Sequence, residues 1–119
     1  MTEIIANKKL WTHLHFDEDN FVEYSSDLSL TNEEYSTIIK GYIPDDISSR
    51  YLAYFENDCL YIHSIMGGAC YLEIYFSQKA DKVYINLIRK YRQYNPHHSK
   101  KETIDFLKSF LRYSLQIDI

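Results

Sequence analysis

The sequence predicts an α+β fold, in which a mostly antiparallel, twisted sheet of five or six strands carries two helices packed on one face. Three observations predict it. Turn-forming pairs separate runs of β-branched and aromatic residues in the middle of the chain. Two capping boxes each precede apolar residues at helical spacing. The length of 119 residues is that of a single domain, residues 1–119.

The N-terminal part is expected to form a hairpin followed by a helix. The hairpin runs from Leu10 to Tyr24 around the turn residues Asp17 to Asn20. Thr31 to Glu34 form a capping box, which predicts that a helix begins there, and Gly41 and Pro44 close it. Its apolar positions at helical spacing are Tyr35, Ile38, Ile39 and Tyr42.

Four strands in the middle of the chain form a predicted meander, with turns at Asn57-Asp58, at Gly67-Gly68 and around Lys79 to Asp81. If Gly67-Gly68 is a two-residue turn, Ile65 lies opposite Cys70, and side-chain alternation assigns every other position to one face. The face expected under the helices holds Leu52, Tyr54, Cys59, Tyr61, His63, Ile65, Cys70, Leu72, Ile74, Phe76, Val83, Ile85 and Leu87. The face expected to point outward holds Tyr51, Ala53, Phe55, Leu60, Ile62, Ser64, Tyr71, Glu73, Tyr75, Tyr84, Asn86 and Ile88.

The C-terminal part contains one ambiguous segment and one clear helix. Val83 to Arg92 fits a strand by its β-branched and aromatic content, but Tyr84, Ile88 and Tyr91 also fit helical spacing, so both assignments stay open. Ser99 to Glu102 form a second capping box. The apolar stripe of the helix that follows is Ile104, Leu107, Leu111 and Leu115, with Phe106 and Phe110 beside it.

Composition excludes several classes of protein. The longest uncharged stretch, Cys59 to Leu72, is shorter than the roughly 20 apolar residues of a membrane span, so no membrane association is expected. The first residues show no apolar core behind a basic end, so no secretory signal is expected. Two cysteines do not make a disulfide framework. We therefore expect a cytoplasmic protein with reduced thiols.

The charge is divided unevenly along the chain. Residues 1–58 hold twelve Asp and Glu against four Lys and Arg, whereas residues 59–119 hold five against nine. The net charge of the whole chain is −4, and tyrosine occurs twelve times. Such an asymmetry indicates a partner-binding face.

A metal site or an active site is not expected. His13, His15 and Asp17 alternate along one strand face, as shared metal coordination requires, but a catalytic zinc needs further ligands that the neighbouring residues do not offer. Cys59 and Cys70 are expected to be buried and to act as small hydrophobic residues. We therefore predict no catalytic residue, no metal and no cofactor. A small hydrolase or metalloenzyme around His13, His15 and Asp17 is the second alternative.

Nucleic-acid binding is the first alternative. The segment from Arg89 to Tyr94 interleaves basic and aromatic side chains, which can pair with phosphates and stack on bases. The net charge of −4 and the isoelectric point near 5.7 oppose this reading, because phosphate affinity depends on a basic surface. Nucleic acid is therefore not the expected partner.

The acidic residues and outward tyrosines together predict a protein-binding surface. Acids in turns project into solvent, and tyrosine provides a large contact area with a polar end. Such a surface suits a basic protein partner and fast association. The predicted partner-binding residues are Asp17, Glu18, Asp19, Glu23, Asp45, Asp46, Tyr51, Tyr71 and Tyr75.

A small, acidic, tyrosine-rich and glycine-poor α+β chain of this kind resembles bacterial immunity proteins, of the type that guards a cell against contact-dependent growth inhibition toxins or colicins. The resemblance is one of size, charge and composition over the whole chain. It implies that the chain binds a basic cytotoxic domain, a nuclease, and blocks its active site. We accordingly expect a binding protein that is not an enzyme and takes no small-molecule ligand.

Overall fold

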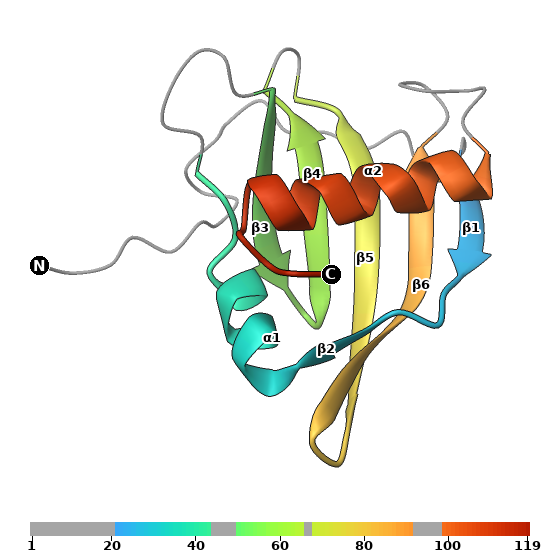
Figure 1. Ribbon diagram of the computed structural model, residues 1–119. Coiled ribbons are helices and arrows are strands. Elements are labelled where there is room, and N and C mark those ends of the chain that lie inside the picture. The colour runs from blue at the N-terminus through green and yellow to red at the C-terminus, as the bar shows by residue number, and fades with distance from the viewer. Residues whose placement is uncertain (1–20, 44–49, 66–67, 92–98) are drawn as a thin grey trace, which may run out of the picture.

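A computed structural model describes residues 21–43, 50–65, 68–91 and 99–119, and within them a six-stranded antiparallel sheet carries two helices (Figure 1). The predicted α+β fold is confirmed. In chain order the elements are β1 (Phe21–Ser25), β2 (Ser29–Thr31), α1 (Asn32–Ile39), β3 (Tyr51–Glu56), β4 (Cys59–Ser64), β5 (Cys70–Lys79), β6 (Lys82–Tyr91) and α2 (Lys100–Tyr113).

The strands follow the order β1-β6-β5-β4-β3, and β2 also pairs with β6. β1 and β2 therefore lie one after the other along the same neighbour, β6. The segment that sequence spacing left open between strand and helix is a strand, because β6 pairs with β5 from Lys82 to Lys90 and buries its β-branched residues Val83, Ile85 and Ile88 in the core. Within the described residues, neither helix has the length and apolar content that a membrane crossing requires.

Both predicted capping boxes are present. The Thr31 hydroxyl accepts the Glu34 backbone N–H at 3.1 Å, and the Glu34 carboxylate accepts the Thr31 N–H at 2.8 Å. The Ser99 hydroxyl accepts the Glu102 backbone N–H at 3.2 Å, and the reciprocal bond is also made. These bonds satisfy N–H groups that a helix start leaves unpaired, and so each helix begins at the residue that the sequence predicts.

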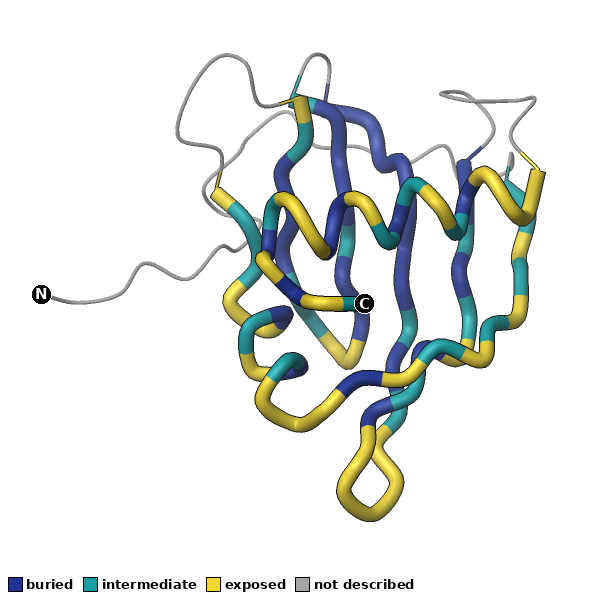
Figure 2. The backbone as a smooth tube through the Cα atoms, in the orientation of Figure 1, coloured by how far each residue is buried: buried dark blue, intermediate teal, exposed yellow. Residues whose placement is uncertain are grey.

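The two helices lie on one side of the sheet, with α2 crossing in front of several strands (Figure 1). Leu107 and Leu111 of α2 are fully buried, and Ile38 of α1 joins them in the same apolar core. The side of α2 that points away from the sheet is exposed, whereas β5 is buried along most of its length (Figure 2). The core therefore lies between the helices and one face of the sheet.

The hairpin between β3 and β4 turns as predicted. Asn57 and Asp58 have φ angles of 54° and 61°, and Glu56 pairs with Cys59 across them. Positive φ at both central residues defines a type I′ turn, whose twist matches that of the two strands. The turn between β5 and β6 is equally short, since Lys79 pairs with Lys82.

The predicted two-residue turn at Gly67-Gly68 is wrong. The Ser64 N–H donates to the Ala69 carbonyl at 2.9 Å, so four residues separate the paired positions. His63 pairs with Cys70 and Ile62 with Leu72, with a bulge between them. A slip of one residue moves every side chain of a strand to the other face, and the face assignment of β3 and β4 is therefore inverted.

A second bulge lies between the pair Tyr75–Leu87 and the pair Phe76–Ile85 of β5 and β6. It places Leu87 on the face predicted for Ile88, and Ile88 on the face predicted for Leu87. Both faces of these strands carry apolar residues, so alternation alone did not distinguish them. The core under the helices contains Ala53, Leu60, Ile62, Tyr71, Leu72, Ile74, Phe76, Val83, Ile85 and Ile88. The register places these residues on the opposite face: Leu52, Tyr54, Cys59, Tyr61, His63, Cys70, Glu73, Tyr75, Leu87 and Arg89.

Candidate functional site

The structure places four of the nine predicted partner-binding residues. The other five, together with two histidines and two residues of the basic segment, lie outside the described residues: Asp17, Glu18, Asp19, Asp45, Asp46, His13, His15, Arg92 and Tyr94. The four residues whose positions are described are Glu23, Tyr51, Tyr71 and Tyr75.

The expectation that Tyr51 and Tyr71 point outward is wrong. Tyr71 is 1% exposed and its ring centroid lies 4.6 Å from that of Phe106 on α2. Tyr51 is partly buried, with its ring 5.1 Å from Phe106. The slipped register of β4 and the bulge at Tyr71 turn both rings under α2. Tyr71 is therefore part of the core and not of a partner-binding surface.

Glu23 and Tyr75, by contrast, come together on the sheet face opposite the helices, and Arg89 joins them. Arg89 Nε and Nη2 donate to Oε2 of Glu23 at 3.1 and 2.9 Å. The Arg89 guanidinium lies 4.3 Å from the ring centroid of Phe21 and 5.8 Å from that of Tyr75. We name this group the Arg89 surface and define it as Phe21, Glu23, Tyr75, Leu87 and Arg89.

The strand register explains why these residues meet. Glu23 of β1 lies opposite Arg89 of β6, and Arg89 lies opposite Glu73 of β5. The same row continues through Tyr61 of β4 to Tyr54 of β3. Paired residues of neighbouring strands share one face, so the row carries charges at one end and stacked aromatic rings at the other.

Glu73 is the buried acid of this row. It is 4% exposed, and its Oε1 accepts the Tyr75 hydroxyl at 2.6 Å. Its Oε2 accepts the Tyr91 hydroxyl and lies 3.8 Å from Arg89 Nη1. Burial first, and then the hydrogen bond to Glu73, raises the pKa of the Tyr75 and Tyr91 hydroxyls. Both hydroxyls are therefore protonated donors to the carboxylate at neutral pH.

The register confirms the outward face predicted for Glu73, but the prediction did not include the burial of its side chain among hydrogen-bond donors. A signal for it is present, because Glu73 is the one charged residue in an otherwise apolar run and Tyr75 follows two residues later on the same strand face. Arg89 and Tyr91 join only through strand pairing, which spacing along the chain does not reveal.

The aromatic end of the row is closely packed. The Tyr54 and Tyr61 rings stack at 5.0 Å, and the Tyr54 and His63 rings at 5.6 Å. Cys59 and Cys70 lie on the same face as buried, free thiols. Burial raises the pKa of Cys59 to about 12 and raises that of Cys70 further, so both thiols are protonated and poor nucleophiles at neutral pH.

The basic segment does not present one surface in the described part of β6. Arg89 and Lys90 alternate to opposite faces of the sheet. Lys90 is 1% exposed, and Arg89 is bonded to Glu23. The described residues of the basic segment therefore lack the row of accessible cations on which phosphate binding depends.

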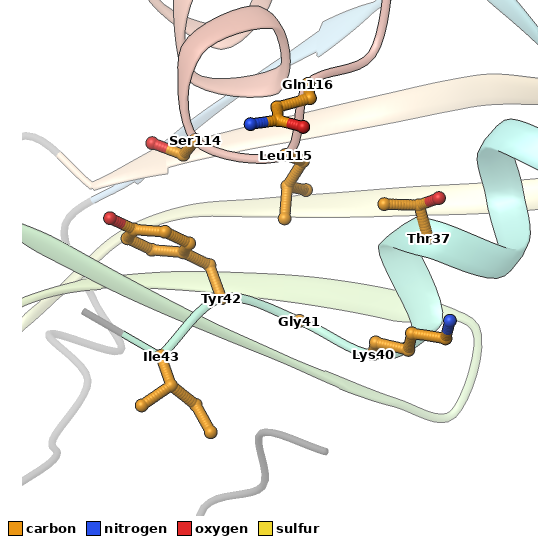
Figure 3. A pocket seen from close by; sticks show the side chains of 8 residues that line it. All are labelled: Thr37, Lys40, Gly41, Tyr42, Ile43, Ser114, Leu115 and Gln116. Carbon is orange, nitrogen blue, oxygen red and sulfur yellow. The ribbon is translucent and has the colours of Figure 1, made fainter. Parts of the chain in front are cut away.

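No group of three His, Cys, Asp or Glu side chains in the described ranges is arranged to hold a metal ion. A groove of about 420 Å³ lies between the C-terminal ends of α1 and α2 (Figure 3). The Tyr42 ring points across it toward Ser114 and Leu115, whereas Ile43 points away. Among the described residues that line it, Lys40 is the one charged residue, and these residues offer mainly apolar, hydroxyl and amide contacts.

Comparison with protein-family models, with curated proteins and with solved structures finds no match for this chain.

Proposed function

We propose that this chain is an immunity-type inhibitor that binds a basic cytotoxic domain, a nuclease, and neutralises it without being an enzyme itself. The observation that carries the proposal is the Arg89 surface: an acid, an arginine and two aromatic rings joined on the sheet face that α1 and α2 leave uncovered. The acid-rich first half of the chain supplies the charge that attracts a basic partner.

The residue types of the Arg89 surface are those of a protein interface. Tyr, Phe and Arg are enriched at interface cores, and Tyr and Arg dominate among residues whose loss weakens binding most. Arg89 is 28% exposed by side chain and is bonded on two sides, so it loses little further freedom when a partner arrives. A side chain that is already ordered lowers the entropic cost of association.

The local charge favours a basic partner. Two carboxylates, Glu23 and Glu73, surround the single guanidinium of Arg89. The Glu23 side chain is 40% exposed, and both of its hydrogen bonds reach Oε2, so Oε1 is an acceptor that the described residues do not use. A lysine or arginine of the partner would find a charge-assisted hydrogen bond there.

Affinity capture from the native host tests the proposal. The wild-type chain and the variants Glu23→Arg and Tyr75→Ala serve as baits, and Asp105→Arg is the matched control because Asp105 is an exposed acid on α2. We expect one basic protein to be retained by wild type and control and lost by the other two baits. We expect its cleavage of DNA or RNA to stop when one equivalent of the wild-type chain is added.

The proposal fails if no basic protein is captured in this pattern, or if the captured protein stays active with the chain bound. Capture of nucleic acid in place of protein, with affinity that falls steeply as salt rises, would instead support a nucleic-acid-binding regulator.

A further inference from the structure

We propose that Glu73 is a positioning residue of the Arg89 surface: its buried carboxylate holds Arg89 and Tyr75 in the orientation that the partner meets. This inference rests on the proposed function. It concerns a residue that makes no contact with the partner itself, since it is 4% exposed.

The geometry connects Glu73 to the surface through two of its members. Tyr75 donates its hydroxyl to Oε1 at 2.6 Å, and Arg89 Nη1 lies 3.8 Å from Oε2. The third donor, Tyr91, is buried and comes from the same strand as Arg89. The carboxylate thus accepts hydrogen bonds from Tyr91 and Tyr75 and forms an ion pair with Arg89, and Tyr75 and Arg89 belong to the candidate interface.

The chemistry of a buried carboxylate explains why Glu73 restrains Arg89 and Tyr75 strongly. Removing a carboxylate from water is costly, and hydrogen bonds from several donors must offset that cost. A hydrophobic residue would fill the same volume without this desolvation cost. Glu73 therefore keeps its donors in place, because releasing any of them leaves a buried carboxylate with less compensation for its desolvation.

Glu23 and Glu73 hold the same guanidinium from opposite sides. Glu23 is exposed, so solvent screens its attraction for Arg89 and the pair alone restrains the side chain weakly. Glu73 acts from the buried side, where the screening is smaller. Of the two acids, the buried one is therefore expected to set the orientation of Arg89.

The test replaces Glu73→Gln, which keeps the size of the side chain and removes its charge. Glu56→Gln is the matched control, because it makes the same change on β3 at the far side of the sheet. The first readout is the NMR signal of the Arg89 Nε–H group, whose exchange with water is slowed by its bond to Glu23. We expect this exchange to become at least about tenfold faster in Glu73→Gln and to be unchanged in Glu56→Gln.

The second readout is affinity for the captured partner. We expect Glu73→Gln to weaken it about tenfold, mainly through faster dissociation, because the interface must now order Arg89 and Tyr75 on binding. The proposal is overturned if the Arg89 signal and the affinity both match wild type while only the free energy of unfolding falls, which is the result expected of a purely structural residue.

The two proposals fail separately. If no partner is captured, faster exchange of the Arg89 Nε–H group in Glu73→Gln still supports the positioning role, and unchanged exchange overturns it. If Glu73→Gln does not fold, Tyr75→Phe takes its place, because it removes only the hydroxyl that donates to Glu73. Wild-type exchange at Arg89 together with wild-type affinity in that variant would overturn the proposal.

Discussion

At the scale of single residues, Arg89 shows how burial decides the strength of an ion pair. Its bond to Glu23 is short, at 2.9 Å, but exposed; its contact with Glu73 is longer, at 3.8 Å, but buried. Exposed ion pairs contribute about 0–1 kcal/mol because water competes for both charges. A buried carboxylate that loses its cation is left with its desolvation cost.

We predict that Arg89→Ala lowers the free energy of unfolding by about 1–3 kcal/mol, because it leaves Glu73 buried without its cation. Glu23→Ala, which removes only the exposed partner, should cost no more than about 1 kcal/mol. Urea denaturation of the two variants measures the difference. Equal losses would contradict the assignment of the buried contact as the stronger one.

The tyrosines around Glu73 predict a pH dependence. The pKa of Tyr75 and that of Tyr91 are raised above 10.0 in the folded chain, by burial and then by the bond to Glu73. Above pH 10 the unfolded chain releases these protons while the folded chain keeps them, so the stability that they contribute is complete below pH 10 and declines as pH rises further.

We therefore expect the free energy of unfolding of wild type to fall from about pH 9 upward, where the two thiols ionise in the unfolded chain, and above about pH 10 to fall less steeply in Tyr91→Phe. Urea titrations at several pH values between about 8 and 11 measure both slopes. The Cys59 thiol, whose pKa is raised to about 12 by burial, adds to the wild-type slope and is present in both chains. Equal slopes in the two chains would show that Tyr91 contributes nothing to the pH dependence of the free energy of unfolding.

At the scale of elements, α2 is the main cover of the sheet. Its side chains on one stripe are buried against both the centre of the sheet and the Tyr42 and Tyr51 rings beside it. The helix is amphipathic, since Lys101 and Asp105 on its other side form an exposed pair. Burial of the apolar stripe, and not the pair, provides most of its contribution to stability.

We predict that Leu107→Ala lowers the free energy of unfolding by about 2–5 kcal/mol, because Leu107 is completely buried and its removal leaves a cavity under α2. Ser109→Ala, at an exposed position of the same helix, is the matched control and should change stability by less than about 0.5 kcal/mol. Denaturant unfolding checks both. A loss below about 0.5 kcal/mol for Leu107→Ala would contradict the packing of α2.

At the scale of the whole molecule, the uneven charge distribution predicts the kinetics of binding. The chain carries a net charge of −4, and its acids are concentrated in residues 1–58. An acidic surface accelerates encounter with a basic protein, and salt screens that attraction over about 10 Å at 0.1 M.

We expect the association rate with the captured partner to fall at least about tenfold between low salt and roughly 0.5 M salt. Reversing the charges of Asp17, Glu18 and Asp19, or of Asp45 and Asp46, should slow association while the chain stays folded. Surface plasmon resonance over a salt series measures the rates, with Asp105→Arg as the control. Rates that ignore both salt and these reversals would remove the electrostatic part of the proposed function.

The sequence alone determined the features that depend on neighbouring residues. The capping boxes at Thr31 and Ser99 satisfy helix starts through bonds that span three positions. The turn at Asn57-Asp58 depends on two residues that accept positive φ. Both helices and the strands β3, β4 and β5 follow from such local signals, whereas the residues of β6 fit strand and helix spacing alike and its pairing with β5 decided the assignment.

Only the tertiary structure decided which face of the sheet the helices cover and where the candidate site lies. Apolar residues occur on both faces of β3 and β4, so the alternation fits either assignment, and a four-residue connection with two bulges selects one of them. Glu23, Glu73 and Arg89 are far apart in the chain and meet because β6 lies between β1 and β5. That strand order depends on long-range pairing, whose energy comes from packing across the whole sheet and leaves no trace in the local spacing of residues.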